Sequence, residues 1–160
     1  MSIAVGENMP AGSFGVMTSS GPSSISTEEL FGGKKVVLVS VPGAFTPTCS
    51  MNHLPGYLDH AEALAEKGVD TIACMAVNDV FVMSAWGKDR DVGDKVVMLA
   101  DGNGDYTRAL GLELDASGFG MGQRGQRFAI VVDNGVATYV AVEAPAQFEV
   151  SKAEAILETL

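Results

Sequence analysis

Cys49 is the residue best placed to do chemistry, because it follows an apolar run and a short loop. The stretch KVVLVSVPGAFTPTCSMNHLP starts at Lys35, and its β-type run ends at Pro42 and Gly43. Cys49 then opens a segment with a helical pattern. At a helix start, unpaired main-chain N–H groups and the helix dipole favour an anion. We therefore expect a nucleophilic thiolate there, the alternative being a buried, inert thiol.

Three further residues could join Cys49 as zinc ligands. His53, His60 and Cys74 would complete a set of four, and the two histidines share a helical arc with Cys49. The set lacks the closely spaced pairs of structural zinc sites, and Pro55 disturbs the helical phase between the histidines. We therefore expect no metal and no cofactor. His53 then either flanks the thiol or is an ordinary solvated or capping histidine. Cys74 lies within an apolar strand and is expected to be buried rather than a resolving thiol.

Two other short patterns fail on their context. Residues 120–125 (GMGQRG) match G-x-G-x-x-G, but a loop precedes them and a strand follows, the reverse of what dinucleotide binding needs. We expect a mobile loop. Residues 101–105 begin like a calcium-binding loop, but Tyr106 stands at its glycine position and Leu112 at its glutamate position. We expect a plain turn.

Composition limits the classes of function. The chain has 160 residues and a formal net charge of -10, so we expect one domain over residues 1–160 that binds neither nucleic acid nor anionic membrane. Two cysteines are too few for a disulfide scaffold and fit a reducing compartment. No stretch approaches the roughly 18 apolar residues of a membrane span, and the first residues lack a secretory-signal pattern. We expect a cytoplasmic protein.

The elements around Cys49 can be predicted from hydrophobic periodicity. The strand 35–41 is almost continuously β-branched, which indicates burial on both faces. The helix after Cys49 should carry an apolar stripe, bend at Pro55 and end at Gly68. The stripe consists of Met51, Leu54, Leu58, Ala61 and Ala65.

The remaining pattern alternates strands and helices. Near the N-terminus we expect edge strands or a hairpin at 3–5 and 14–17, followed by a helical turn at 26–31. We then expect a strand at 70–77, a helix at 80–88 ended by Gly87, a strand at 95–99, a helix at 105–111 and a glycine-rich loop at 115–125. The last elements should be strands at 126–133 and 136–142 joined by Asn134-Gly135, and a helix at 151–159 opened by a Ser151–Glu154 capping box. This order predicts an α/β chain of thioredoxin-like layout, a mixed β-sheet flanked by helices. Catalytic groups then belong at the carboxyl ends of strands.

The segment VPGAFTPTCSMNHLPGY resembles the active-site segment of peroxiredoxins, whose pattern is Pro-x-x-x-Thr-x-x-Cys. Pro42, Thr46 and Cys49 keep every spacing of that pattern. The segments AVNDVFVMSAW and RFAIVVDNG are similar to the peroxiredoxin 5 subfamily, so the resemblance covers the chain from about residue 3 to residue 160.

The resemblance implies a thiol peroxidase acting on hydrogen peroxide and small alkyl hydroperoxides. The Cys49 thiolate would attack the O–O bond and become a sulfenic acid. Thr46 and the N–H of Cys49 would hydrogen-bond the peroxide, and Pro42 would shield the thiolate from water. The family arginine corresponds to Arg127, which we prefer to Arg124 in the neighbouring loop. Its fixed cation would hold the thiolate and polarise the peroxide.

The resemblance also implies further contacts. Gly43, Phe45, His53 and Phe119 would line the substrate pocket, the two phenylalanines as apolar walls. The family implies homodimers through a face near the active-site loop.

Many subfamily members carry a resolving cysteine near the last helix, where this chain reads AQFEVSKAEA. We therefore predict a one-cysteine mechanism with an external thiol, from glutathione, glutaredoxin or thioredoxin, so Cys49 should be accessible to that thiol. One alternative is a redox sensor or relay that passes oxidation from Cys49 to a partner protein. A structural metal-binding domain is a third possibility.

Overall fold

A seven-stranded sheet forms the centre of the computed structural model, which describes residues 1–160. Its order is β2-β1-β5-β4-β3-β8-β9. The strands are β1 (Ser13–Thr18), β2 (Gly21–Ser26), β3 (Lys35–Ser40), β4 (Thr71–Ala76), β5 (Val97–Ala100), β8 (Phe128–Asp133) and β9 (Val136–Val142). β3 pairs in parallel with β4 and antiparallel with β8. The sheet is therefore mixed, as the sequence predicts.

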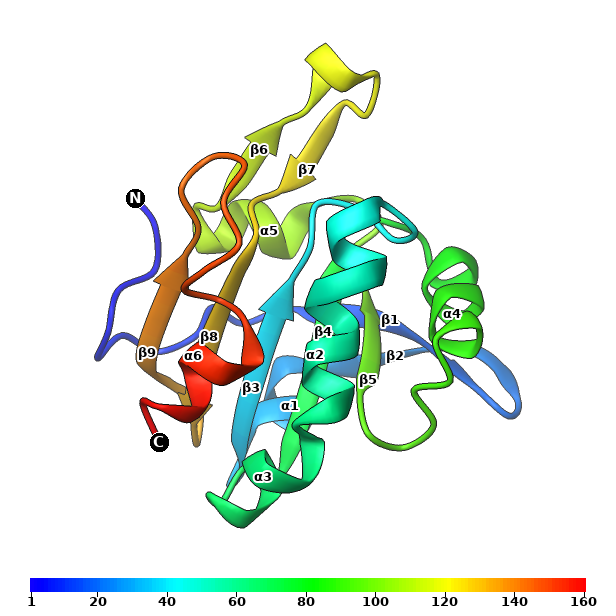
Figure 1. Ribbon diagram of the computed structural model, residues 1–160. Coiled ribbons are helices and arrows are strands. Elements are labelled where there is room, and N and C mark those ends of the chain that lie inside the picture. Colours follow the sequence, from blue (N-terminus) through cyan, green and yellow to red (C-terminus); the bar gives the residue numbers. More distant parts are fainter.

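Helices cover both faces of this sheet (Figure 1). They are α1 (Thr27–Phe31), α2 (Leu54–Asp59), α3 (Ala61–Glu66), α4 (Val80–Asp89), α5 (Asp105–Leu110) and α6 (Ala153–Leu157). α2, α3, α4 and α6 share one apolar cluster, and α1 and α5 share a second cluster on the opposite face. None of these helices combines the length and the apolar character needed to cross a membrane.

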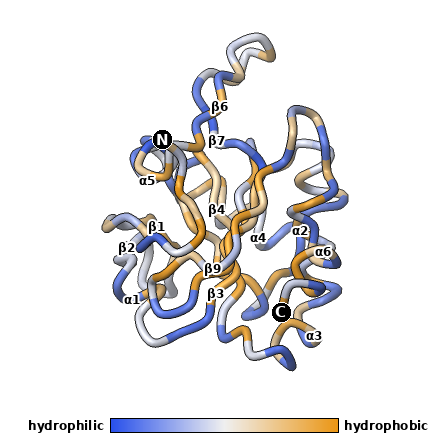
Figure 2. The backbone as a smooth tube through the Cα atoms, turned by 90° about the vertical axis from the view of Figure 1, so that its left-hand side faces the viewer, coloured by the Kyte–Doolittle hydropathy of each residue, from blue (hydrophilic) through white to orange (hydrophobic).

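β3 lies inside the sheet, between β4 and β8, and both of its faces are buried. Val37 and Val39 belong to the α2 cluster, whereas Val36 and Leu38 belong to the α1 cluster. Burial on both sides explains why β3 reads as an unbroken apolar run. In Figure 2 the strands through the middle of the molecule are orange, while much of the surrounding chain is blue or white. β3 is thus a rigid base for the loop that leads to Cys49.

The helix after β3 differs from its predicted form. It begins with a π-helical segment, η1 (Cys49–His53), in which the N–H of Leu54 donates to the carbonyl of Cys49. Pro55 lies in the first turn of α2, where a missing N–H costs little, and the break falls at His60 between α2 and α3. The wider π turn rotates the helical phase. Met51, predicted to face the core, is consequently 71% exposed.

The glycine-rich segment predicted as a loop is a small hairpin. Strands β6 (Glu113–Asp115) and β7 (Gln123–Gly125) pair antiparallel. A 3-10 turn, η2 (Ser117–Phe119), and two glycines with positive φ close the hairpin. Figure 1 shows it projecting from one end of the molecule, beyond α5.

The helical turn predicted at 26–31 is confirmed, whereas two other helix ends differ from prediction. The capping box forms at Ser26 and Glu29, whereas the hydroxyl of Ser151 donates to Glu143 and α6 starts after Lys152. α4 continues through Gly87 to Asp89, because Gly87 packs inside against Met98 and Val92. At the N-terminus, residues 14–17 lie in β1 but residues 3–5 form no strand. The Asn134-Gly135 hairpin is confirmed between β8 and β9.

Candidate active site

The loop after β3 carries Cys49 to the first turn of a helix. Residues 47–48 are already helical, and Cys49 starts η1. The loop is held by the hydroxyl of Thr46, which donates to the carbonyl of Gly43 over 2.7 Å, and by the N–H of Ala44, which donates to the Asn78 side chain over 3.0 Å. Phe45 has a φ of 66°, a left-handed conformation that is uncommon for a bulky residue. Such strain is typical of functional loops.

Arg127 lies directly beside this cysteine. It precedes β8, and the pairing of Ser40 with Phe128 brings the start of β8 next to the end of β3. Its Nη2 donates to Cys49 Sγ over 3.1 Å, across 78 residues of sequence. Arg124 turns elsewhere, donating to the carbonyls of Val77 and Met121. The structure therefore brings Arg127, and not Arg124, to the cysteine.

The charge of Arg127 has no carboxylate partner. The three ion pairs of the structure are His60–Glu154, Arg90–Asp89 and Arg108–Asp105, and none includes Arg127. A guanidinium stays protonated at all ordinary pH values. Its positive charge is thus available to stabilise the thiolate of Cys49.

His53 holds the other side of the guanidinium. Arg127 Nη1 lies 2.9 Å from His53 Nδ1, and His53 Nε2 lies 3.1 Å from the carbonyl of Ser151. Because a guanidinium can only donate, Nδ1 must accept and the ring proton must sit on Nε2. Burial, together with the Arg127 charge, lowers the pKa of His53 to about 3. His53 is therefore a neutral acceptor that orients Arg127.

Glu143 fixes the carbonyl that His53 uses. Its Oε2 accepts from the hydroxyl and the N–H of Ser151 and from the N–H of Glu149, over 2.6 to 2.8 Å. Burial opposes ionisation of Glu143, but hydrogen bonds from Ser151 and neighbouring N–H groups outweigh it and lower its pKa. Tyr57 also donates to the Ser151 carbonyl, over 2.7 Å. A chain of contacts thus runs from Glu143 through His53 to Arg127.

A pocket of about 360 Å³ opens beside Arg127. Pro42 and Phe119, both predicted site residues, line it, and Phe119 is 87% exposed at the hairpin tip. Phe148 lies under the guanidinium, with its ring centroid 5.9 Å from the central carbon of Arg127, and it also meets the His53 ring edge-on. The predicted pocket residues Gly43, Phe45 and His53 do not line this pocket. Phe45 packs toward Trp86 instead, and His53 is fully buried in the interior.

Cys49 itself is fully buried, which corrects the expectation that it is accessible to a second thiol. The helical turn that presents it packs against the sheet, and Cys49 belongs to the α2 cluster. Sequence periodicity could not show this, because the π turn directs Cys49 and His53 inward together. The Cys49 sulfur therefore meets a bulky partner molecule only when this turn opens.

Cys74 is buried as well. It lies in β4 beside Val39 of β3. Burial, with a smaller contribution from Cys49, raises the pKa of its thiol well above the usual value. Cys74 is thus a poor source of thiolate, as predicted for a buried cysteine.

The other candidate sites carry no such arrangement. No group of three or more His, Cys, Asp or Glu side chains is placed to hold a metal ion. The Asp101 carboxylate accepts from the main chain of Tyr106 and from Thr107, so it serves the start of α5. Residues 120–125 lie in the β6–β7 hairpin, without the helix that a dinucleotide site needs.

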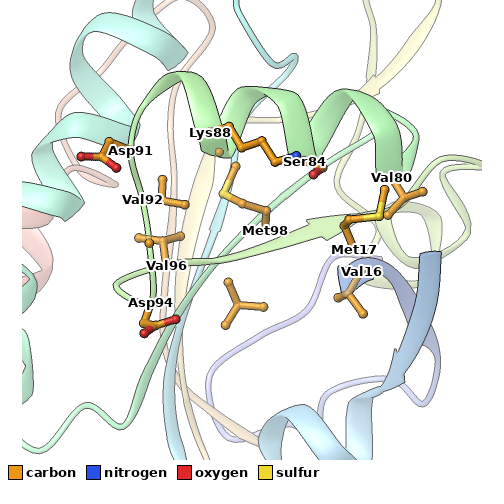
Figure 3. A pocket seen from close by; sticks show the side chains of 13 residues that line it. Val16, Met17, Val80, Ser84, Lys88, Asp91, Val92, Asp94, Val96 and Met98 are labelled. Carbon is orange, nitrogen blue, oxygen red and sulfur yellow. The ribbon is translucent and has the colours of Figure 1, made fainter. Parts of the chain in front are cut away.

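A larger pocket, about 550 Å³, lies between α4 and the strands β1 and β5 (Figure 3). Met17 and Met98 point into it, and its charged residues are Lys88, Asp91 and Asp94. It contains neither cysteine nor histidine, so its Ser84 and Lys88 have no thiol or imidazole beside them to take part in redox or acid–base chemistry. The chemistry belongs to the smaller pocket beside Arg127.

The chain is similar to known proteins over nearly its whole length. The family model described as Redoxin matches residues 4–157. Peroxiredoxin-2C of Arabidopsis thaliana is 47% identical over 159 residues, covering 99% of this chain and 98% of the relative. Reduced Prx3 of Vibrio vulnificus in complex with H2O2 is 53% identical, with a TM-score of 0.94 and 98% of each chain covered. The 1-Cys peroxiredoxin of Plasmodium falciparum is 31% identical, with a TM-score of 0.91 and 98% of each chain covered.

Proposed function

Since this chain belongs to the Redoxin family and is a peroxiredoxin, a thiol-dependent peroxidase of thioredoxin-like fold, we propose that Cys49 is its peroxidatic nucleophile. The observation that carries the proposal is the 3.1 Å contact from Arg127 Nη2 to Cys49 Sγ. A guanidinium without a carboxylate partner favours the thiolate and attracts the polar peroxide. Cys74 lacks any such contact.

In the proposed reaction, the Cys49 thiolate attacks one peroxide oxygen in line with the O–O bond. An S–O bond forms, the O–O bond breaks, and the leaving oxygen takes a proton and departs as water or an alcohol. Arg127 and the N–H of Cys49 stabilise the charge that develops on the two oxygens. The Thr46 hydroxyl already donates to Gly43, so its lone pairs accept a hydrogen bond from the peroxide. Pro42 offers no N–H and covers one side of the sulfur.

The substrates are hydrogen peroxide and small alkyl hydroperoxides. The similar Vibrio vulnificus protein was solved with H2O2. In this chain the pocket beside Arg127 combines its guanidinium with Leu114, Phe119 and Phe148. A polar end beside apolar walls suits a peroxide group that carries a short alkyl substituent.

The sulfenic acid is reduced by an external thiol from glutathione, glutaredoxin or thioredoxin. The first thiol releases water and forms a mixed disulfide with Cys49, and a second thiol displaces the restored Cys49. Support comes from the raised pKa and complete burial of Cys74, the only other cysteine. The likeness to the 1-Cys peroxiredoxin of Plasmodium falciparum agrees with this scheme.

Steady-state peroxide consumption with each reductant in turn tests this function. Wild-type protein should turn over with at least one thiol system, and the Cys49→Ser variant with none. Full turnover by that variant would overturn the assignment. An intramolecular Cys49–Cys74 disulfide after one equivalent of peroxide, detected by mass spectrometry, would overturn the one-cysteine scheme.

A homodimer that buries the rim of the active site is part of the proposal. Three exposed apolar side chains lie on the segments around Cys49, namely Phe45, Met51 and Phe81, which are 50%, 71% and 64% exposed. Exposed apolar side chains of this size are typical of interfaces. Sedimentation should give a dimer for the wild type and a monomer for Phe81→Glu; a monomeric wild type would contradict it.

A cytoplasmic location is also part of the proposal. It fits a catalytic thiol that must be kept reduced, because the cytosol is a reducing compartment.

A further inference from the structure

Ser50, the residue after the nucleophile, makes a contact that the reaction scheme does not use. Trp86 Nε1 donates to Ser50 Oγ over 2.7 Å. Ser50 is 5% exposed and Trp86 is fully buried. The bond therefore ties the segment that carries Cys49 to α4 in the interior of the molecule.

The two ends of this bond differ in how firmly they are held. Trp86 lies within the ten-residue helix α4, which Asp79 caps, and belongs to the core cluster with Leu54. Ser50 lies in η1, a single π-helical segment whose N-cap residue, Thr48, makes no side-chain hydrogen bond. Isolated π-helical segments are rare and occur frequently at functional sites. If the bond breaks because one partner moves, the moving partner is therefore the η1 segment that carries Ser50.

We propose that the Trp86–Ser50 hydrogen bond is a latch that positions the Cys49 segment and sets how often it opens to an external thiol. The inference rests on the proposed function, because it requires that an external thiol reduces Cys49. Its physical basis is that Cys49 is fully buried, so a thiol attached to a peptide reaches it only when η1 moves. Opening must break this bond, so the bond strength enters the opening equilibrium.

The latch has opposite effects on the two halves of the reaction. The peroxide step needs the closed segment, because only there does Arg127 contact Cys49 Sγ. The thiol step needs the open segment. Weakening the bond should therefore speed reduction by a thiol while leaving the peroxide step unchanged or slower. A residue that only stabilised the fold would not divide the two steps in this way.

The decisive experiment measures how fast 4,4′-dithiodipyridine labels reduced Cys49 in a Cys74→Ala background, under conditions where closing outpaces labelling. The rate then reports the open fraction. Ser50→Ala removes the acceptor and Trp86→Phe the donor. Since such a bond contributes about 1 kcal/mol, each variant should label roughly fivefold faster. Ser50→Ala also leaves the indole N–H of Trp86 unpaired, so its labelling should rise by up to roughly 100-fold.

Tyr106→Phe is the matched control. The Tyr106 hydroxyl donates to the carbonyl of Pro10 over 2.9 Å, in the cluster on the other face of the sheet. This variant loses an aromatic hydrogen bond of similar kind without touching η1, so its labelling rate should equal that of the parent.

Two further results decide the inference. The Ser50→Ala/Trp86→Phe double variant should label no faster than either single variant, because all three lack the same bond. In steady-state kinetics, both single variants should show a lower KM for the thiol reductant than the wild type. Their kcat/KM for peroxide should not rise. Labelling of Ser50→Ala no faster than that of Tyr106→Phe overturns the latch, and that comparison suffices even if Trp86→Phe does not fold. Faster labelling without peroxidase turnover would keep the latch and reject the reaction scheme.

Discussion

Arg127 serves two acceptors at once, and this arrangement determines what its charge can do. One nitrogen faces Cys49 Sγ and another faces His53 Nδ1. His53 is neutral because burial, helped by the Arg127 charge, lowers its pKa to about 3. An acidic partner would neutralise the guanidinium, whereas a neutral imidazole orients it and leaves the charge for the sulfur.

Replacing His53 should slow the peroxide step without removing the nucleophile. In His53→Phe, Arg127 loses the acceptor that fixes its plane, and we expect the second-order rate constant for hydrogen peroxide to fall roughly 100-fold. His60→Phe is the matched control, since His60 lies on the same helical stretch and contacts Gly56 and Glu154. Stopped-flow measurement with limiting peroxide checks both. Equal rates in the two variants would show that His53 does not orient Arg127.

The two arginines near the pocket should behave differently. Arg127→Lys replaces a two-sided fork by a point charge that cannot contact Cys49 and His53 together. We expect the peroxide rate constant to fall about 100-fold to 1,000-fold, as when one oxyanion donor is lost. Arg124→Lys should change it less than about threefold, because Arg124 bonds only main-chain carbonyls near the hairpin. A larger loss in the Arg124 variant would reverse the assignment.

At the scale of elements, the segment between β9 and α6 acts as a strap over the arginine. Glu143 directly follows β9, and one of its carboxylate oxygens accepts hydrogen bonds from both Ser151 and Glu149. This fold of the segment places Phe148 under the guanidinium and the Ser151 carbonyl against His53. The strap, rather than the helix α6 itself, carries the contacts that reach the site.

Removing the Glu143 carboxylate should loosen this strap. In Glu143→Ala the buried N–H and hydroxyl of Ser151 lose their acceptor, and we expect the free energy of unfolding to fall by about 2–4 kcal/mol. The pKa of Glu143 is lowered in the folded chain, so this stabilisation exists above the usual carboxyl pKa and is lost as pH falls through the lowered value. The exposed Glu149→Ala variant should lose less than about 0.5 kcal/mol. Urea unfolding at neutral pH compares the two, and equal losses would rule out the strap.

Sequence patterns correctly predicted the elements that depend mainly on residues close together in the chain. The β-branched run of β3 and the Asn134-Gly135 turn were correctly placed because burial on two faces and a left-handed turn leave clear marks in sequence. The π-helical segment was missed, since it depends on how Cys49 packs. Ser151 was wrongly assigned to a capping box because its hydroxyl is claimed by Glu143, a partner outside the helix.

At the scale of the whole molecule, the buried network makes stability depend on pH. The unfolded chain binds a proton at His53 near pH 6.5, whereas the folded chain does so only near pH 3. Below about pH 6.5 the unfolded state therefore holds more protons, and stability falls as pH falls.

Between pH 7 and pH 5 the wild type should lose about 2 kcal/mol of unfolding free energy through His53. His53→Gln lacks that titration and should lose correspondingly less over the same range. Thermal or urea unfolding at the two pH values measures the difference. An identical loss in wild type and variant would show that His53 is not buried in its neutral form.

The site was only partly predictable from sequence. Pro42, Thr46 and Cys49 lie within one short motif, so their spacing could be recognised. Arg127 is 78 residues from Cys49 and was found through family resemblance, because no local pattern marks an arginine that sheet pairing brings close. Glu143 and Phe148 left no recognisable signal. The burial of Cys49 came from packing that a periodicity argument cannot supply.

The central claim is that Cys49 is the peroxidatic cysteine and Cys74 takes no part. Its most direct test treats reduced protein with one equivalent of hydrogen peroxide in the presence of dimedone, followed by peptide mapping. Cys49 should carry a dimedone adduct, and Cys74 should keep an unmodified thiol. An adduct on Cys74, or oxidation of neither cysteine while peroxide is consumed, would contradict it.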